Sequence, residues 1–199
     1  MIPLPFRRPK RSATIDALYG MIVAQARSPS FYRGYGVPDA VEARIDMIML
    51  HLVLVLRGLR GKADCQPMAQ QARSTAQQNR PLAQDLFDRF CQDMDDNFRE
   101  MGVGDLTVPK EMLRIAEAFY GRAKAYDTAL DAGDAAGLEA ALARNIFNAA
   151  EINSGARRLA AYVREAVSSI GTQDALLGGQ DTLLAGNVRF PDPETVAPV

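Results

Sequence analysis

Apolar residues recur at intervals of three and four along most of the chain, which is the period of an amphipathic α-helix. The six helices that this pattern predicts cover residues 14–27, 39–59, 81–102, 109–130, 134–147 and 154–170. Alternation of apolar and polar residues, which predicts a β-strand, does not extend over any useful length, and no internal repeat occurs. The pattern therefore predicts an all-α, single-domain helical bundle of about six helices.

The expected helix 39–59 is the most apolar of the six. In its second half, the run Met47–Leu56 places Leu, Val and Met on almost the full circumference. A helix that is apolar on most sides has to be covered by its neighbours, so we expect this one at the centre of the bundle. Asp39, with Glu42 three residues later, is the expected N-cap of this helix, and Asp134 is the expected N-cap of the helix 134–147.

Proline and glycine divide the predicted helices. Ser28-Pro29-Ser30 ends the first helix, and the aromatic, glycine-containing segment Phe31–Pro38 is too broken to form a long one. We interpret this segment as a lid packed on the core, with a ligand-facing surface as the alternative. Further along, Met101–Asp105 is a glycine-containing joint, and Pro109 opens the helix that follows it.

Three stretches lie outside the clearest helical stripes. Residues 1–11, MIPLPFRRPKR, form a basic, proline-rich N-terminal arm, and residues 12–170 form the helical domain. A short helix over 68–78 is expected before Pro81, which fits the first turn of the next helix. Residues 171–199 turn to glycine, proline and aspartate, so an irregular and loosely attached C-terminal tail is expected.

Composition excludes several classes of function. In a chain of 199 residues, a net charge of −1 gives no overall attraction to DNA or to an anionic membrane. No apolar run approaches the ~20 residues that span a bilayer. The N-terminal arm contains a small basic cluster of Arg7, Arg8, Lys10 and Arg11. Contact with a ribosome or a membrane surface is one interpretation of this cluster, and a disordered basic terminus is the other.

No arrangement of residues indicates catalysis or a bound cofactor. His51 is the only histidine and has no nucleophile beside it in the sequence pattern, so we interpret it as a structural, hydrogen-bonded residue. A haem ligand beside an apolar cavity is the alternative. Cys65 and Cys91 are far apart, and we expect both thiols to be reduced and unpaired in a cytoplasmic protein.

Acidic side chains crowd the helix 81–102 and the joint after it. The candidate oxygen ligands for Mg²⁺ or Ca²⁺ are Asp93, Asp95, Asp96, Glu100 and Asp105. They lack the spacing of a calcium loop, and one histidine cannot supply the two Glu-x-x-His pairs of a di-iron bundle. A solvated acidic face is therefore favoured over a metal site. We expect Arg99, Glu100 and Arg122 to form ion pairs that lock the two helices at the joint.

Three groups of residues follow one another in a characteristic order. The first contains Phe31-Tyr32, Gly36-Val37-Pro38-Asp39, Arg44, Asp46 and Leu50-His51. The second contains Leu86-Phe87-Asp88, Asp93-Met94-Asp95 and Arg99-Glu100-Met101-Gly102-Val103-Gly104-Asp105. The third contains Phe119-Tyr120-Gly121-Arg122 and Ala125-Tyr126. Each alone is weak, but together they span about residues 12–147 and resemble the ubiquinol–cytochrome c chaperone family.

The resemblance implies a non-enzymatic chaperone that binds newly made cytochrome b during assembly of the respiratory bc1 complex. Mitochondrial members sit near the ribosomal exit tunnel with a small partner subunit, and they carry a long leader. This sequence begins almost at once with the first helix, so it looks like a bacterial member. A cytoplasmic location, with peripheral association at the inner membrane as a variant, is expected.

A membrane-protein client offers apolar helices and short basic loops, so an aromatic groove rimmed by acidic residues complements it. The candidate client-binding residues are Phe31, Tyr32, Tyr35, Asp88, Asp95, Asp96, Tyr120 and Arg122. The candidates either for binding or for fixing the joint are Asp93, Arg99, Glu100, Gly102, Gly104 and Asp105. The alternatives are a carboxylate metal-binding protein and a haem or lipid carrier that uses His51.

Overall fold

The computed structural model describes residues 10–60, 69–176 and 188–196, and the side chains of 12–60, 82–171 and 188–196. The helices are α1 Lys10–Ala26, α2 Pro29–Gly34, α3 Val41–Arg60, α4 Ala69–Glu100, α5 Val108–Ala132, α6 Ala135–Ile146 and α7 Ser154–Leu176. No strand occurs in the described ranges. The all-α prediction is confirmed, and α2 is a short helix added to the six expected.

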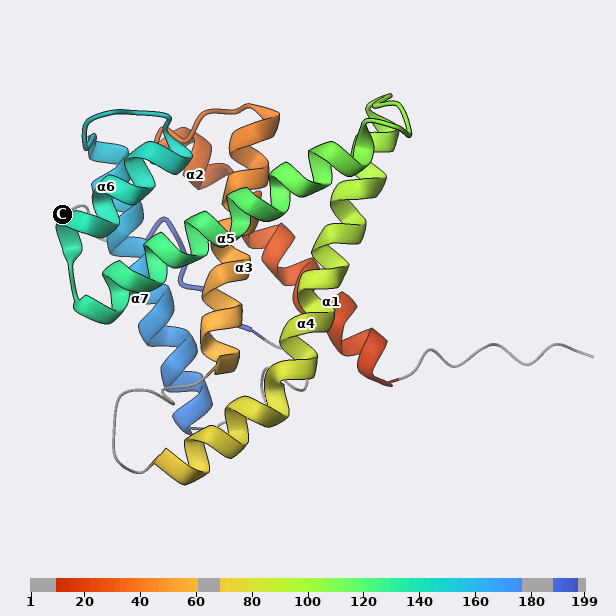
Figure 1. Ribbon diagram of the computed structural model, residues 1–199. Helices are drawn as coiled ribbons and strands as arrows, with labels where there is room; N and C mark the ends of the chain where they lie inside the picture. Colours follow the sequence, from red (N-terminus) through yellow and green to blue (C-terminus); the bar gives the residue numbers. More distant parts are fainter. Residues whose placement is uncertain (1–9, 61–68, 177–187, 197–199) are drawn as a thin grey trace, which may run out of the picture.

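α3 lies at the centre of the bundle, as its apolar circumference predicts. Figure 1 shows it between α1 and α4 on one side and α6 and α7 on the other, with α5 crossing in front. Every side chain from Met47 to Leu56 is buried. Because each buried Leu, Val or Met stabilises the fold by roughly 1.5–3 kcal/mol, α3 anchors the helices that surround it.

α4 is one long helix where the sequence predicts two. A separate short helix over 68–78 and a new helix at Pro81 were expected, but one helix runs from Ala69 to Glu100. The Ala- and Gln-rich stretch before Pro81 favours helix, and an internal proline bends a helix without always ending it. Figure 1 shows α4 changing direction between its yellow first part and its yellow-green second part.

A tight turn joins α4 to α5. Gly102 has a φ of 81°, in the left-handed region that glycine adopts most readily. The amide of Val103 donates to the carbonyl of Phe98 and the amide of Gly102 donates to that of Arg99, both at 3.0 Å. These two bonds form a Schellman motif, which satisfies the last carbonyls of α4. Pro109 lies in the first turn of α5, as predicted.

Two predicted helix caps have different outcomes. The Asp134 side chain caps α6 by accepting a hydrogen bond from the Gly137 amide at 2.9 Å, as expected. Asp39 does not cap α3, because that helix begins at Val41 and the Asp39 carboxylate accepts from Nε of Arg44 at 2.7 Å. A charged guanidinium is a stronger donor than a backbone amide, which accounts for the difference.

The C-terminal region also differs from the expected loose tail. α7 continues past Gly171 to Leu176, and residues 188–196 pack against the bundle. Val188 and Val196, near the two ends of this segment, are only 5% and 4% exposed. The segment has no helical stripe because it contains no helix: residues 188–192 are irregular and residues 193–195 form a turn. A few apolar residues among prolines gave too weak a pattern to predict its packing.

Candidate functional site

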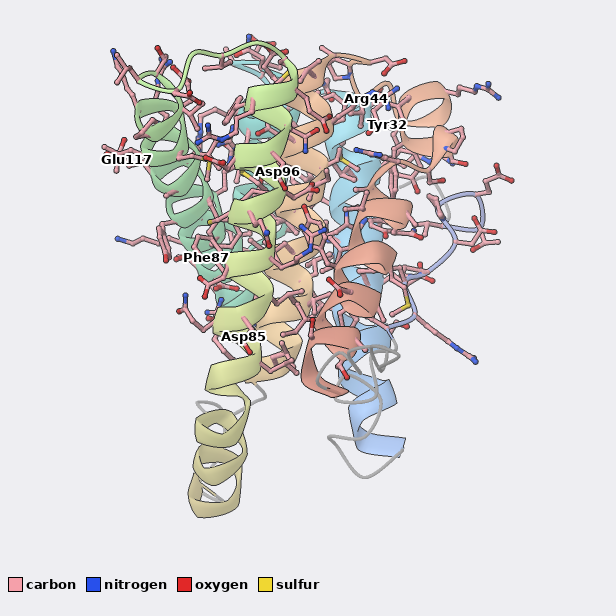
Figure 2. The ribbon with its side chains drawn as sticks, turned by 90° about the vertical axis from the view of Figure 1, so that its right-hand side faces the viewer. Tyr32, Arg44, Asp85, Phe87, Asp96 and Glu117 are labelled. Carbon is pink, nitrogen blue, oxygen red and sulfur yellow. The ribbon has the colours of Figure 1, made fainter. Side chains whose placement is uncertain are left out.

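α4 and α5 form an outer surface that starts at the joint and extends along both helices. The ring of Phe87 on α4 lies 4.9 Å from that of Phe119 and 5.6 Å from that of Tyr120 on α5, measured between centroids. Phe119 is buried, whereas Tyr120 is 61% exposed. The aromatic cluster therefore continues from the core to the surface between the two helices, where Figure 2 labels Phe87.

Exposed apolar side chains concentrate on this surface. Leu113 is 60% exposed and precedes Tyr120 by seven residues, so both lie on one stripe of α5. Met101 and Leu106, in the joint, are 52% and 98% exposed. Among the described residues, only one other large hydrophobic side chain, Val41 on α3, is exposed. Such a concentration is typical of a binding surface rather than of random exposure.

Carboxylates border the apolar stripe. Asp88 and Asp95 are seven residues apart on α4, so they lie on one stripe beside Phe87, and Glu117 is exposed on α5. Asp96 points about 100° further round α4 than Asp95 does. We call the surface formed by Phe87, Asp88, Asp95, Leu113, Glu117 and Tyr120 the α4–α5 face. It offers apolar contact area with a negative border.

Arg99 fixes the geometry of the joint. Its Nε donates to Asp95 at 2.7 Å, and its guanidinium also pairs with Asp105 beyond the turn. Together with the positive φ of Gly102, these pairs hold the end of α4 and the turn in one arrangement. Arg99 therefore forms ion pairs at the joint, as expected, but they join the end of α4 to the turn and do not reach α5.

Arg122 has a different position from the one expected. It pairs with Asp46 of α3 at 2.8 Å and so joins α5 to the central helix rather than to the joint. The two side chains are 21% and 15% exposed, which shields them from solvent. Burial raises the pKa of Asp46 to about 6, although the Arg122 guanidinium and its hydrogen bond act in the opposite direction.

The predicted aromatic groove is divided between two places. Phe31 and Tyr35 are buried in the core, at 0% and 3% exposure, and do not lie beside Tyr120. Tyr32 is half-buried, donates its hydroxyl to the Ala26 carbonyl at 2.9 Å and lies under the guanidinium of Arg44. Figure 2 shows Tyr32 and Arg44 on the opposite side of α4 from Glu117. The α4–α5 face thus gathers Asp88, Asp95 and Tyr120, without the residues around α2.

His51 belongs to a buried chain of hydrogen bonds. Its Nδ1 lies 2.8 Å from the Met47 carbonyl, which can only accept, so Nδ1 carries the proton and Nε2 accepts from the Tyr162 hydroxyl at 2.9 Å. That hydroxyl in turn accepts from Nε2 of Gln25 at 3.0 Å. Burial lowers the pKa of His51 to about 4, so the ring is neutral.

The hydrogen bonds of His51 occupy its whole ring. Both nitrogens already have partners, and the side chain is fully buried. The structural interpretation of His51 fits this geometry, because a haem ligand needs a nitrogen directed at an open coordination position. The ring stabilises the junction of α3 with α7.

The acidic residues of α4 are also engaged with protein partners. Asp93 accepts from the Tyr19 hydroxyl at 2.8 Å, and Asp95 and Asp105 pair with Arg99. No group of three or more potential ligands gathers within the described side chains.

Cys91 is unpaired, as expected, whereas Cys65 and the arm residues Arg7 and Arg8 lie outside the described residues, as do the side chains of Lys10 and Arg11. Over the same part of the chain, no helix combines the length and apolar character required of a membrane span.

Sequence reasoning missed part of the surface. Phe87, Leu106 and Leu113 were not candidates for binding. Leu106 and Leu113 are exposed, whereas Phe87 is partly buried and packs against the core. An apolar residue on the polar side of an amphipathic helix is the signal that could have identified Leu113. Leu106 lies in a turn, where a single apolar residue carries little information.

The chain is similar to known proteins over most of its length. The model of the ubiquinol-cytochrome C chaperone family matches residues 33–190. The chain is 25% identical over 187 residues to ubiquinol-cytochrome-c reductase complex assembly factor 1 of Xenopus laevis, an alignment that covers 94% of this chain and 84% of the relative. The crystal structure of the Cbp3 homolog from Brucella abortus is similar with a TM-score of 0.77 and 35% identity, over 94% of each chain. The family model covers well over half of the sequence, and the protein therefore belongs to the ubiquinol-cytochrome C chaperone family.

Proposed function

We propose that this protein is a non-enzymatic chaperone that binds cytochrome b during assembly of ubiquinol–cytochrome c reductase, the bc1 complex. Family membership and the name of the Xenopus laevis relative support a role in assembly of that complex. The observation that carries the binding proposal is the α4–α5 face, where apolar side chains are exposed beside carboxylates.

The α4–α5 face matches the chemistry of such a client. Leu113 and Tyr120 offer apolar area. Because they are 60% and 61% exposed, covering either one with a client helix contributes less than the roughly 1.5–3 kcal/mol gained by burying a fully exposed large apolar side chain. Asp88 and Glu117 border this area and would attract basic residues at the ends of membrane helices, whereas the charge of Asp95 is balanced by Arg99. Arg99 and Gly102 act indirectly, because they hold the joint that sets the angle between α4 and α5.

A chaperone of this kind needs no catalytic group. The described side chains provide a fixed surface, and His51, the chain's only histidine, is used within the core. The contact of the arm with a ribosome or membrane surface, a small partner subunit and peripheral association with the inner membrane stay predictions. Such contacts would bring the protein close to newly made cytochrome b.

Site-specific photocrosslinking tests the proposed surface. A photoreactive benzoyl-phenylalanine replaces Leu113 in one variant and Val41 in a matched control, since both positions carry an exposed apolar side chain. In cells that make the bc1 complex, we expect a covalent product with cytochrome b from position 113 and little or none from position 41. Equal products from both positions, or a product from position 41 alone, would contradict the proposal.

A further inference from the structure

The turn between α4 and α5 carries two apolar side chains that project into solvent. Leu106 is 98% exposed and Met101 is 52% exposed, and we call these two side chains the apolar tip. Figure 1 shows the turn at an outer corner of the bundle, at the upper right, with only α4 and α5 leading to it. A corner of this shape can approach a flat surface without a collision between that surface and the other helices.

The apolar tip is not explained by the stability of the fold. Because Leu106 keeps almost its whole surface in solvent, it contributes very little apolar burial to the core. Single exposed apolar residues are common on protein surfaces, but here two lie within six positions, and the exposed Leu113 follows on α5. We therefore looked for a partner that would cover the tip.

The backbone of the turn is prepared for an apolar environment. Five of its amide groups donate to carbonyls of the turn or of the end of α4, at 2.7–3.1 Å; they belong to Met101, Gly102, Val103, Thr107 and Val108. A backbone amide without an acceptor is costly in contact with hydrocarbon, where no water replaces the missing bond. These internal bonds lower the cost of moving the turn from water to the boundary of a lipid layer.

The charges around the tip balance one another. The segment 99–114 contains three cations and three carboxylates, so its net charge is zero: Arg99, Lys110, Arg114, Glu100, Asp105 and Glu111. Two of the cations are paired within the segment, Arg99 with Asp105 and Arg114 with Glu111. A zwitterionic lipid surface therefore neither repels nor strongly attracts this segment, and apolar burial decides whether the tip binds.

The shape of the tip favours lipid over a protein partner. A protein would need a cavity that fits one side chain projecting from a convex turn, whereas acyl chains are fluid and adapt to it. The exposed Lys110 follows Leu106 by four positions, and its long side chain can extend to the lipid phosphates while Leu106 enters the acyl region. The charged Asp105 beside Leu106 keeps the insertion shallow.

We propose that the apolar tip inserts into the surface of a lipid bilayer. Leu106 and Met101 enter the boundary between headgroups and acyl chains, and the paired charges of the joint stay among the headgroups. Two side chains provide weak, reversible attachment, because even a complete acyl anchor binds a membrane only marginally by itself. This proposal goes beyond the proposed function and is independent of it, since attachment to lipid requires no cytochrome b.

Tryptophan fluorescence tests the proposal, because the chain contains no tryptophan of its own. Leu106→Trp places a single reporter in the tip, and Val41→Trp is the matched control at an exposed apolar position on α3. The full-length variants are titrated with vesicles of phosphatidylcholine and phosphatidylethanolamine. We expect the emission of the tryptophan at position 106 to shift to shorter wavelength and to be quenched by bromine atoms on the acyl chains. The tryptophan at position 41 should show neither effect.

A second pair of variants separates the tip from the reporter. Met101→Trp should also respond to these vesicles, and adding Leu106→Asp should lower its apparent affinity for lipid at least about tenfold, because a charge replaces the more exposed anchor. Since position 106 is almost fully exposed, both variants should fold, and circular dichroism checks this.

Three results would overturn the proposal. The first is an equal response at positions 106 and 41, or an affinity that Leu106→Asp does not change. The second is a response that requires anionic lipid and disappears at high salt, which would assign the contact to basic residues elsewhere in the chain. The third is a response at position 106 to a membrane-helix peptide but not to lipid, which would assign the tip to a protein partner.

Discussion

The core around His51 and the α4–α5 face each contain a tyrosine, but the surroundings of the two tyrosines differ. In the core, His51, Tyr162 and Gln25 form one continuous chain of hydrogen bonds, closed by the Met47 carbonyl. On the face, Leu113 and Tyr120 remain exposed beside carboxylates. Polar groups that are satisfied internally stabilise the fold, whereas apolar groups left at the surface have contact area available for a partner.

Two tyrosines allow this comparison to be tested with the same chemical change. Tyr162→Phe leaves Nε2 of His51 without its donor and removes the acceptor of Gln25, so we expect the free energy of unfolding to fall by about 1–3 kcal/mol. Tyr120→Phe, on an exposed side chain, should change it by less than about 0.5 kcal/mol. Urea denaturation measures both values. Equal losses in the two variants would show that the core chain has no special structural role.

Acidification distinguishes the fully buried His51 from the partly buried Asp46. Between pH 6.5 and about 4, the unfolded chain binds a proton at His51 that the folded chain does not, so this group's contribution to stability is lost as the pH falls. Asp46 acts in the opposite direction: the folded chain binds its proton below about pH 6, the unfolded chain only below 3.8, so stability increases as the pH falls through that window.

A variant that lacks the Asp46 carboxyl should therefore show a different slope of the free energy of unfolding against pH. We expect Asp46→Asn to lose stability more steeply than the wild type between pH 6 and 4.5, by at most about 1.4 kcal/mol per pH unit. Denaturation curves collected at several pH values give the difference directly, because all other groups are common to both proteins. Parallel pH profiles would mean that Asp46 has an ordinary pKa in the folded state.

The central architecture was predictable because it depends on local patterns. The apolar circumference of Met47–Leu56 requires burial on all sides, and Pro109 and Asp134 mark helix starts by mechanisms that act within one turn. The same locality explains the errors. A proline such as Pro81 either ends or bends a helix, and only the surrounding packing decides which of the two occurs.

The candidate site was less predictable, since it depends on contacts between distant segments. Phe31 and Tyr120 both read as aromatic residues near glycine, yet one is in the core and the other is exposed. The partner of Arg122 is Asp46, on a helix 76 positions earlier in the sequence, rather than the nearer acidic residues of the joint. The segment 188–196 has no helical periodicity that specifies where it packs, because side chains of the bundle hold it by its backbone carbonyls.

The most direct test of the account is complementation of a strain that lacks the gene. A variant with Leu113→Asp and Tyr120→Asp places two carboxylates on the α4–α5 face, and Val41→Asp is the matched control at an exposed apolar position outside it. The readout is the spectral haem b of the bc1 complex, with circular dichroism confirming that both variants fold. We predict that Val41→Asp restores haem b and that the double variant does not. Full restoration by a folded double variant would contradict the assignment of the α4–α5 face as the client-binding surface.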